Sequence, residues 1–246
     1  MRINLVLRSK PQTFIPFNYN SSLNAMILDK IRFADPEYAQ EIHDSKGFKF
    51  FTFSELTIPK RKLDKRGGLV ILSNTISLFV SSPRDRFVRA FLSGVLCRPQ
   101  VRIGPAEFTL ENANALPSPD FSTGVSTFRT MTPIIASTKR EIGGKLRSWD
   151  LMPTDNQFYN NIRNNIIRKY KKFTGRIPKD GTLNVKVMKP LRPRRIKVKE
   201  EFHTGSRIVF EASGNPELLE FAYECGFGER NSMGFGMVRT EDSHVD

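Results

Sequence analysis

The sequence has few of the residues that build disulfide frameworks and metal centres. Its 246 residues include two cysteines, Cys97 and Cys225, which lie far apart and have no histidine cluster beside them. Neither a disulfide framework nor a zinc site is therefore supported, and we interpret both thiols as small buried hydrophobic groups. Carboxylates do not cluster at a spacing typical of metal nucleases either, so we expect no metal and no other cofactor.

Long hydrophobic runs are also missing. No uninterrupted apolar stretch approaches the roughly 20 residues that a membrane-spanning helix needs. The first seven residues, Met1–Leu7, are too short and too polar for a signal peptide. These two absences predict a cytoplasmic protein that does not enter a membrane.

Positive charge, by contrast, is present in excess. The chain carries 39 Lys and Arg against 25 Asp and Glu, which gives a formal net charge of +14. Such a balance favours a polyanionic partner, either nucleic acid or an anionic membrane surface. Nucleic acid is the better candidate because the apolar segments that membranes require are missing.

Part of this charge is concentrated in Lys186–Lys199, which contains no acid and which we call the basic ribbon. A charged run is usually only a solvated face. Here prolines stiffen the segment, and the alternation after Pro193 places several charges on one side of an extended chain, which favours a groove that follows phosphates. The predicted RNA-binding residues of the ribbon are Arg192, Arg194, Arg195, Lys197 and Lys199. A second basic face is expected on the preceding helix, with Arg163, Arg168, Lys169, Lys171, Lys172 and Arg176.

Hydrophobic periodicity predicts the same order of elements in both halves of the chain. In the first half, the predicted strands are Arg2–Leu7, Phe50–Pro59, Leu69–Val80 and Gln100–Leu110. The predicted helices of this half are Ser21–Arg32, a short one from Asp35 to Ile42, and one that begins at Pro83. Lys60–Gly68 joins two strands as a basic hairpin, in which Lys60, Arg61 and Lys62 are candidate RNA-binding residues.

The second half follows a polar, proline-containing linker, Asn112–Pro119. Its predicted strands are Ser126–Thr138, Leu183–Met188, Arg207–Ala212 and Phe235–Thr240. A helix capped by Asp155 and a helix from Asn215 to Gly226 complete it. In each half the order strand, helix, strand, strand, helix, strand is the ferredoxin-like arrangement. We therefore predict an α+β protein of two tandem ferredoxin-like (RRM-like) domains, residues 1–115 and 120–246.

Four glycines gather in the segment Gly226–Val238, which we call the glycine-rich loop. Glycine tolerates positive φ and has no side chain, so this loop can wrap its N–H groups around phosphates. A wide hairpin turn is the alternative, and the spacing fits neither the dinucleotide fingerprint nor the ATPase phosphate loop. The candidate RNA-binding residues of the loop are Gly226, Gly228, Arg230, Asn231, Ser232, Gly234 and Gly236.

Three segments together resemble a known family. Phe17–Asn20, Ile42–Leu56 and above all Gly226–Gly236 are similar to the CRISPR repeat-RNA (pre-crRNA) processing endoribonucleases of the RAMP superfamily, and the resemblance runs nearly end to end. It implies two ferredoxin-like domains that bind the repeat portion of a CRISPR transcript. It also implies that they cut once per repeat without metal, leaving guide RNAs for a multisubunit interference complex.

The same resemblance implies the catalytic residues His43 and Lys49. A histidine suits proton transfer because its ordinary pKa lies near neutrality, and Lys49 follows six positions later across Gly47. Lys46 is an alternative cation and a candidate RNA contact. Leu28 departs from the pattern, because some members of the family carry a tyrosine there. Tyr38 and Tyr19 are candidate substitutes for that phenol, and His203 and His244 are weaker candidate site residues.

Three functions remain open from the sequence. The first is a metal-independent endoribonuclease, whose products would be a 2',3'-cyclic phosphate and a 5'-hydroxyl. The second is a non-catalytic subunit of the same family that holds the crRNA, an option that Leu28 keeps open. The third is a generic tandem RNA-recognition protein, which ranks last because the aromatic-and-glycine strand motif of that class is not evident. Whether the chain forms a homodimer is left open.

Overall fold

The computed structural model describes residues 1–198 and 201–241, and the chain divides into two compact units. The first unit contains Met1–Lys49 and Phe53–Pro117, and the second contains Phe50–Thr52 and Ser118–Asp246. Three residues from the first half of the sequence therefore belong to the second unit. Among the described residues, no helix is both long and apolar enough to cross a membrane.

The first unit is built on a sheet with the strand order β3-β6-β1-β8-β7. Its central strand β1 (Arg2–Ser9) pairs antiparallel with β6 (Thr75–Ser81) on one side and with β8 (Ala106–Leu116) on the other. The edge strands are β3 (Thr52–Phe53) and β7 (Gln100–Ile103). Ile3, Leu5 and Leu7 alternate along β1 and are fully buried, which fixes the face that the helices cover.

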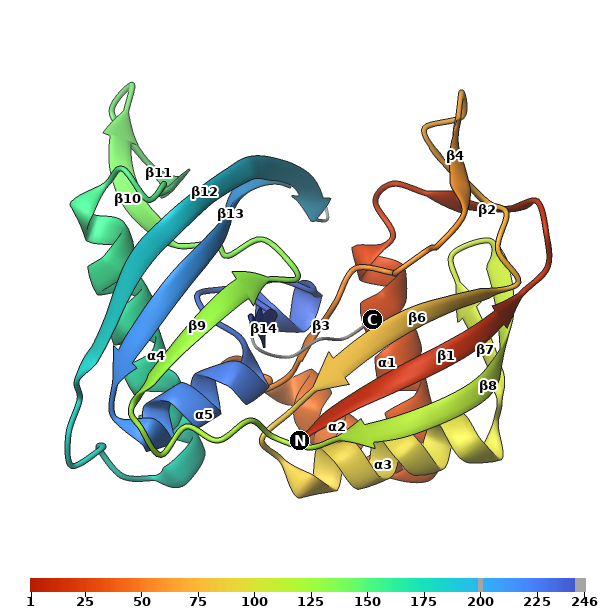
Figure 1. Cartoon of the computed structure of the whole chain (residues 1–246), viewed down its shortest axis with the longest axis horizontal. Coiled ribbons are helices and arrows are strands. Elements are labelled where there is room, and N and C mark those ends of the chain that lie inside the picture. Colours follow the sequence, from red (N-terminus) through yellow and green to blue (C-terminus); the bar gives the residue numbers. More distant parts are fainter. Residues whose placement is uncertain (199–200, 242–246) are drawn as a thin grey trace. The chain divides into compact units, whose positions relative to one another are not determined.

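Helices α1 (Asn20–Ala34) and α3 (Asp85–Cys97) pack together on one face of this sheet (Figure 1). Gly94 permits the contact, because a Cβ at this position would lie 2.0 Å from the Lys30 carbonyl oxygen. The Lys30 side chain is buried and donates hydrogen bonds to the carbonyls of Arg98 (2.5 Å) and Gln100 (2.6 Å). Burial lowers the pKa of Lys30. A small second sheet contains β2 (Thr13–Pro16), β5 (Gly68–Ile71) and β4 (Arg61–Asp64).

The second unit repeats this plan with the strand order β12-β13-β9-β14. The strands are β9 (Val125–Thr130), β12 (Leu183–Val198), β13 (Glu201–Gly214) and β14 (Val238–Thr240), and neighbours are antiparallel. Helices α4 (Asn156–Thr174) and α5 (Pro216–Cys225) lie on one face (Figure 1). Both units therefore have the ferredoxin-like order, which confirms the predicted fold class.

Several predicted boundaries of the first half are wrong. Leu69–Val80 is not one strand, since it divides between β5 and β6, which belong to different sheets. Of the predicted strand Phe50–Pro59, only β3 is a named strand. Gln100–Leu110 is a hairpin of β7 and β8, because Gly104 adopts positive φ and turns the chain. Most of the predicted linker continues β8 as far as Leu116.

In the second half the corrections concern strand lengths. The predicted strand Ser126–Thr138 ends at Thr130, and a separate hairpin follows, formed by β10 (Ser137–Ile142) and β11 (Lys145–Asp150). Strand β12 is much longer than predicted and contains nearly all of the basic ribbon.

The predicted helix caps and thiols have mixed outcomes. The cap of α5 is as predicted, because the Asn215 side chain accepts a hydrogen bond from the Glu217 amide at 2.9 Å. Asp155 precedes α4, but its carboxylate accepts from the Met152 amide at 2.8 Å instead of from the helix. Cys225 is buried as expected, whereas Cys97 is exposed because it lies in the last turn of α3, past the stripe that faces the sheet.

Candidate functional site

The helix that carries His43 is fixed at its amino-terminal end. This helix, α2 (Pro36–Asp44), is capped by Asp35, whose carboxylate accepts a hydrogen bond from the Tyr38 amide at 3.0 Å. Arg86 of α3 donates two hydrogen bonds to the same carboxylate, at 2.7 and 3.0 Å, and one to the Glu41 carboxylate at 2.8 Å. These bonds, the Arg86 pair first, lower the pKa of Asp35. The charged pair joins α2 to α3 within the first unit.

His43 lies in the last turn of α2 and faces solvent. Its side chain is 80% exposed, and Nδ1 lies 3.2 Å from Asp44 Oδ1. Hydrogen bonds from Gln40 first, and from His43 second, lower the pKa of Asp44. An imidazole oriented at Nδ1 by a carboxylate presents Nε2 to a substrate, which is an arrangement suited to proton transfer.

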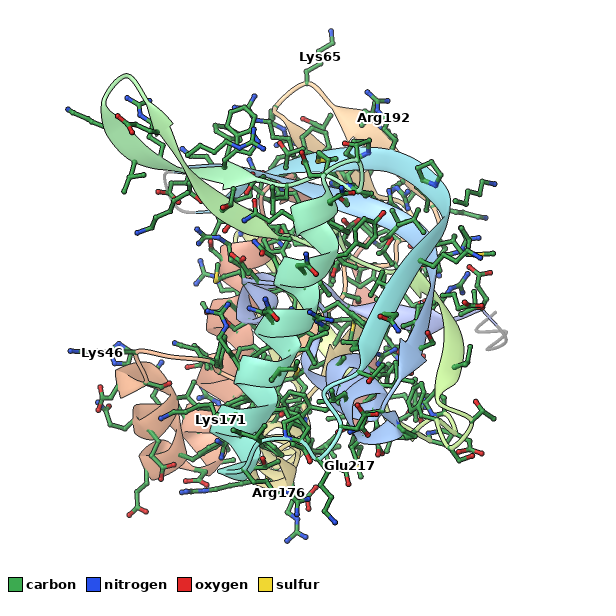
Figure 2. The ribbon with its side chains drawn as sticks, turned by 90° about the vertical axis from the view of Figure 1, so that its left-hand side faces the viewer. Lys46, Lys65, Lys171, Arg176, Arg192 and Glu217 are labelled. Carbon is green, nitrogen blue, oxygen red and sulfur yellow. The ribbon has the colours of Figure 1, made fainter. Side chains whose placement is uncertain are left out.

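The two candidate lysines lie in the loop that follows α2. Ser45 ends the helix. Lys46 is exposed, and its side chain points outward from the loop into solvent (Figure 2). Lys49 is half-buried and makes contacts of its own. The next residue, Phe50, belongs to the second unit, where its ring packs on Phe173 at 5.4 Å and on Phe221 at 6.4 Å between centroids. The loop therefore ends at a firmly packed residue.

The two substitute tyrosines are not available at the surface. Tyr38 is buried, its hydroxyl has no hydrogen-bond partner among the described residues, and burial raises its pKa to about 12. Tyr19 is also buried, and its hydroxyl accepts a hydrogen bond from the Leu56 amide at 3.1 Å. Both phenols therefore have structural roles, while Leu28 is half-buried on α1.

The weaker histidine candidates gain no support. His203 is 4% exposed on β13, and its Nδ1 lies 3.3 Å from Asp150 Oδ1, so its imidazole is not accessible to RNA. His244 lies outside the described residues, as does Lys199 of the basic ribbon.

In the glycine-rich loop, the group that lies close to the glycines is the protein's own backbone. Gly226, Gly228, Gly234 and Gly236 are buried and have positive φ. A Cβ on Gly236 would lie 1.8 Å from the Phe227 carbonyl oxygen, and the Phe227 amide donates a hydrogen bond to the Gly236 carbonyl at 2.8 Å. The loop is thus a closed turn, and glycine is required by its internal packing.

Several amides of this loop are already used inside the protein. The Gly226 amide donates to Ala222, the Gly234 amide to Asn231 and the Gly236 amide to Pro133. Asn231 adds two bonds from its side-chain amide, to the carbonyls of Phe227 (3.1 Å) and Phe235 (3.0 Å). Contacts of this loop with RNA stay a prediction, and exposed Arg230 is the member best placed to make one.

A buried lysine completes the loop. Lys169 of α4, which the sequence places on a basic surface, is 2% exposed. Its ammonium donates to Gly226 O (2.6 Å), Gly228 O (3.1 Å) and Asn231 Oδ1 (2.9 Å), which uses all three of its donors. Burial lowers its pKa and raises that of the adjacent Cys225 thiol. The other members of the predicted second basic face are accessible to solvent: Arg163, Arg168, Lys171, Lys172 and Arg176 (Lys171 and Arg176 in Figure 2).

The basic ribbon lies on β12, an edge strand of its sheet. Ile196 and Val198 are buried against Ile135 and Phe235, so the alternation turns Arg195 and Lys197 to the opposite face. Arg195 lies over the Phe202 ring at 4.5 Å, and Arg192 projects into solvent (Figure 2). The register shifts between Leu191 and Arg194, and this bulge changes the direction in which the charged side chains point.

In the first unit, the β4–β5 hairpin exposes Lys60, Arg61, Lys62 and, at its tip, Lys65 (Figure 2).

Comparison with known families covers nearly all of these residues. Residues 14–114 match the family described as CRISPR-associated protein Cas6, N-terminal, and residues 116–240 match CRISPR associated protein Cas6, C-terminal. The chain belongs to the Cas6 family. The N-terminal match contains His43, Lys46 and Lys49, and the C-terminal match contains the basic ribbon and the glycine-rich loop.

Individual Cas6 relatives are similar over almost the whole chain. The protein named CRISPR-associated endoribonuclease Cas6 1 from Methanocaldococcus jannaschii is 38% identical over 97% of this chain and 92% of its own length. A protein from Pyrococcus horikoshii, named putative CRISPR-associated endoribonuclease-like protein Cas6nc, is 35% identical over 97% and 99%. A solved structure described as an RAMP protein binding different RNA substrates is 35% identical, with a TM-score of 0.87 and coverage of 98% and 99%.

Two features of this Cas6 chain were not predicted from the sequence. One is the β10–β11 hairpin, although its Gly143-Gly144 turn between polar, alternating segments is a recognisable hairpin signal. The other is a pocket of about 530 Å³ beside α4, lined by Ser137, Asn161, Asn164, Ile167, Arg168 and Glu229. Only the folded chain brings these residues together, since they come from three separate segments.

Proposed function

We propose that this chain is a metal-independent endoribonuclease that binds CRISPR repeat RNA and cuts the precursor transcript within each repeat. Membership of the Cas6 family across both units is the observation that carries the proposal. The exposed imidazole of His43, which lies within the region matched by the N-terminal family, agrees with it.

The reaction is a transfer of the phosphoryl group within the RNA. The 2'-hydroxyl oxygen attacks the adjacent phosphorus and loses its proton, while the bond from phosphorus to the 5'-oxygen breaks and that oxygen gains a proton. The products are a 2',3'-cyclic phosphate and a 5'-hydroxyl. In this proposal His43 transfers a proton and Lys49 stabilises the negative charge that builds up on the phosphate.

Basic surfaces of both units support RNA as the substrate. The basic ribbon and the β4–β5 hairpin expose cations that suit phosphates. The relative structure described as binding different RNA substrates is consistent with this role. We place the activity in the cytoplasm, where the guide RNA would pass to a multisubunit interference complex.

A non-catalytic crRNA-binding subunit is the second candidate. Two observations favour it: Leu28 supplies no phenol, and a 35% identical relative is named endoribonuclease-like rather than endoribonuclease. The two candidates agree on RNA binding and differ only in catalysis.

The deciding experiment incubates the purified protein with the repeat RNA of its host in excess EDTA. We expect one cut per repeat, which is lost when the 2'-hydroxyl at the cut site is removed. His43→Ala should slow cleavage by at least about 10²-fold with little change in RNA affinity. Glu37→Ala, an exposed change near the start of the same helix, is the matched control. Tight binding without any cut would support the second candidate instead.

A further inference from the structure

The β10–β11 hairpin has two chemically different faces. In its register Thr138 lies opposite Trp149 and Arg140 lies opposite Arg147. Because side chains alternate along each strand, these four share one face with Lys145. The described side chains of this face include three cations and no acid. Those of the opposite face are Ser137, Lys139, Glu141, Leu146, Ser148 and Asp150.

The cationic face places like charges against one another. Arginines directly opposite across an antiparallel pair repel, which costs stability unless an anion compensates. Arg140 lies over the Trp149 ring at 4.8 Å, and its Nη2 is 3.7 Å from Asp155 Oδ1. Arg147 has no hydrogen-bond or ion-pair partner among the described residues, and Trp149 is 43% exposed. This face therefore offers an aromatic surface beside Arg147, a cation without an ion-pair partner among the described residues.

The same face continues onto α4. Gln157 Nε2 donates to Thr138 Oγ1 at 3.3 Å, so the cationic face is turned towards the first turns of the helix. The hairpin projects beyond the amino-terminal end of α4 (Figures 1 and 2). Along the helix, Gln157, Asn161, Asn164 and Arg168 recur at spacings of four, three and four, which places them on one stripe.

The pocket of about 530 Å³ lies along this stripe. Its volume is within the range of roughly 300–1,000 Å³ in which small ligands bind. Its single acid, Glu229, accepts hydrogen bonds from the Ser137 amide (3.0 Å) and hydroxyl (2.8 Å), so its charge is directed into the protein. Asn164 and Arg168 have no hydrogen-bond partner among the described residues, which leaves amide and guanidinium groups for a ligand.

We propose that this surface is a subsite for single-stranded RNA. A base stacks on Trp149, the phosphates beside it meet Arg140 and Arg147, and an adjoining nucleotide enters the pocket against Asn164 and Arg168. Stacking on an aromatic ring combined with a cationic track is how proteins hold unpaired nucleotides. The choice of RNA rests on the proposed function.

The test uses Trp149 itself, because it is the only tryptophan in the chain and its fluorescence reports this surface alone. Addition of a single-stranded repeat oligonucleotide should quench the emission, and the midpoint should match that of binding measured by anisotropy of a labelled RNA. Trp149→Ala should weaken binding roughly 5- to 150-fold, the range for removal of one base–aromatic stack. Trp149→Phe should retain most of the affinity.

Leu146→Ala is the matched control, since Leu146 is 70% exposed on the opposite face of the same hairpin, and it should leave binding unchanged. RNA that binds without quenching, together with equal affinities of Trp149→Ala and Leu146→Ala, would overturn the subsite but leave the proposed function standing. Equal quenching by heparin or by duplex RNA would show charge attraction alone and would also overturn it. A protein that binds no RNA at all would refute both proposals.

Discussion

The ammonium of Lys169 lies 2.6 Å from the carbonyl oxygen of Gly226, at the point where α5 ends and the glycine-rich loop begins. Its two other bonds reach Gly228 and Asn231, and Asn231 in turn binds the carbonyls of Phe227 and Phe235. The buried ammonium of Lys169 on α4 thus fixes the loop through hydrogen bonds to acceptors of buried residues.

Lys169→Met should therefore destabilise the second unit. Methionine fills a similar volume but leaves the three buried acceptors unsatisfied, at a cost of about 1–3 kcal/mol for a group left unpaired in this way. Part of this cost is offset because the mutation also removes a buried charge. Thermal unfolding followed by circular dichroism measures the effect. Lys171→Met, an exposed change two residues later, is the control, and an equal Tm for the two variants would contradict the role of Lys169.

Gly236→Ala should be more damaging still. The new methyl group would lie 1.8 Å from a backbone oxygen at a φ of +73°, so the loop would have to open. We expect a destabilisation of several kcal/mol, roughly the upper range for single substitutions, and mainly insoluble protein. Gly181→Ala is the control, because its methyl group would meet only the end of Ile167 at 3.5 Å. Wild-type expression and Tm for Gly236→Ala would show that the loop is less tightly closed.

The sequence was sufficient for the fold, but not for the interactions that determine the site. Apolar alternation at Ile3, Leu5 and Leu7 and the cap at Asn215 are local signals, and they predicted elements that the structure contains. Whether a lysine is buried depends on residues distant in sequence. Lys169 lies close to Lys171 in the chain, yet its acceptors are 57 to 62 positions away. The glycines of the loop predict a backbone that another group can approach closely, but the sequence does not show that this group is the protein's own backbone.

The contribution of the Asp35–Arg86 ion pair to stability should appear as a pH-dependent Tm difference between wild type and Asp35→Asn. Asparagine caps a helix about as well as aspartate, so the substitution removes mainly the charge. Because the pKa of Asp35 is lowered in the folded chain, its contribution is complete above its ordinary value of 3.8 and is lost as pH falls through the lower folded pKa. The Tm difference between wild type and variant should be constant near neutrality and should close below pH 3.8. A difference independent of pH would contradict the pairing, and Arg89→Lys serves as an exposed control on α3.

Variants of the two lysines that follow α2, Lys46 and Lys49, should differ in a cleavage assay. If Lys49 stabilises the charge on the phosphate, Lys49→Ala should slow single-turnover cleavage by roughly 10²- to 10³-fold, the usual cost of removing one such donor. Lys46 is directed to solvent, so Lys46→Ala should change mainly the affinity for RNA (Figure 2). The reverse result would assign the catalytic cation to Lys46. Circular dichroism of both variants checks that the half-buried Lys49 has not been needed for folding.

Neutralising the basic ribbon should change how RNA binding depends on salt. Replacement of Arg194, Arg195 and Lys197 by Ala removes three cations from β12, two of which alternate with the buried Ile196 and Val198. For a single strand, each phosphate that no longer meets a cation should reduce the slope of log affinity against log salt by about 0.7, so a reduction of up to about 2 is expected.

The control for this experiment is a second triple variant, in which Lys10, Arg89 and Lys179 are replaced by Ala. It carries the same change in net charge at exposed residues outside β12 and outside the predicted basic face of α4. Equal slopes for the two triple variants would mean that the total charge of the protein, rather than the ribbon, attracts RNA. A reduced slope confined to the first variant would place the phosphates along β12.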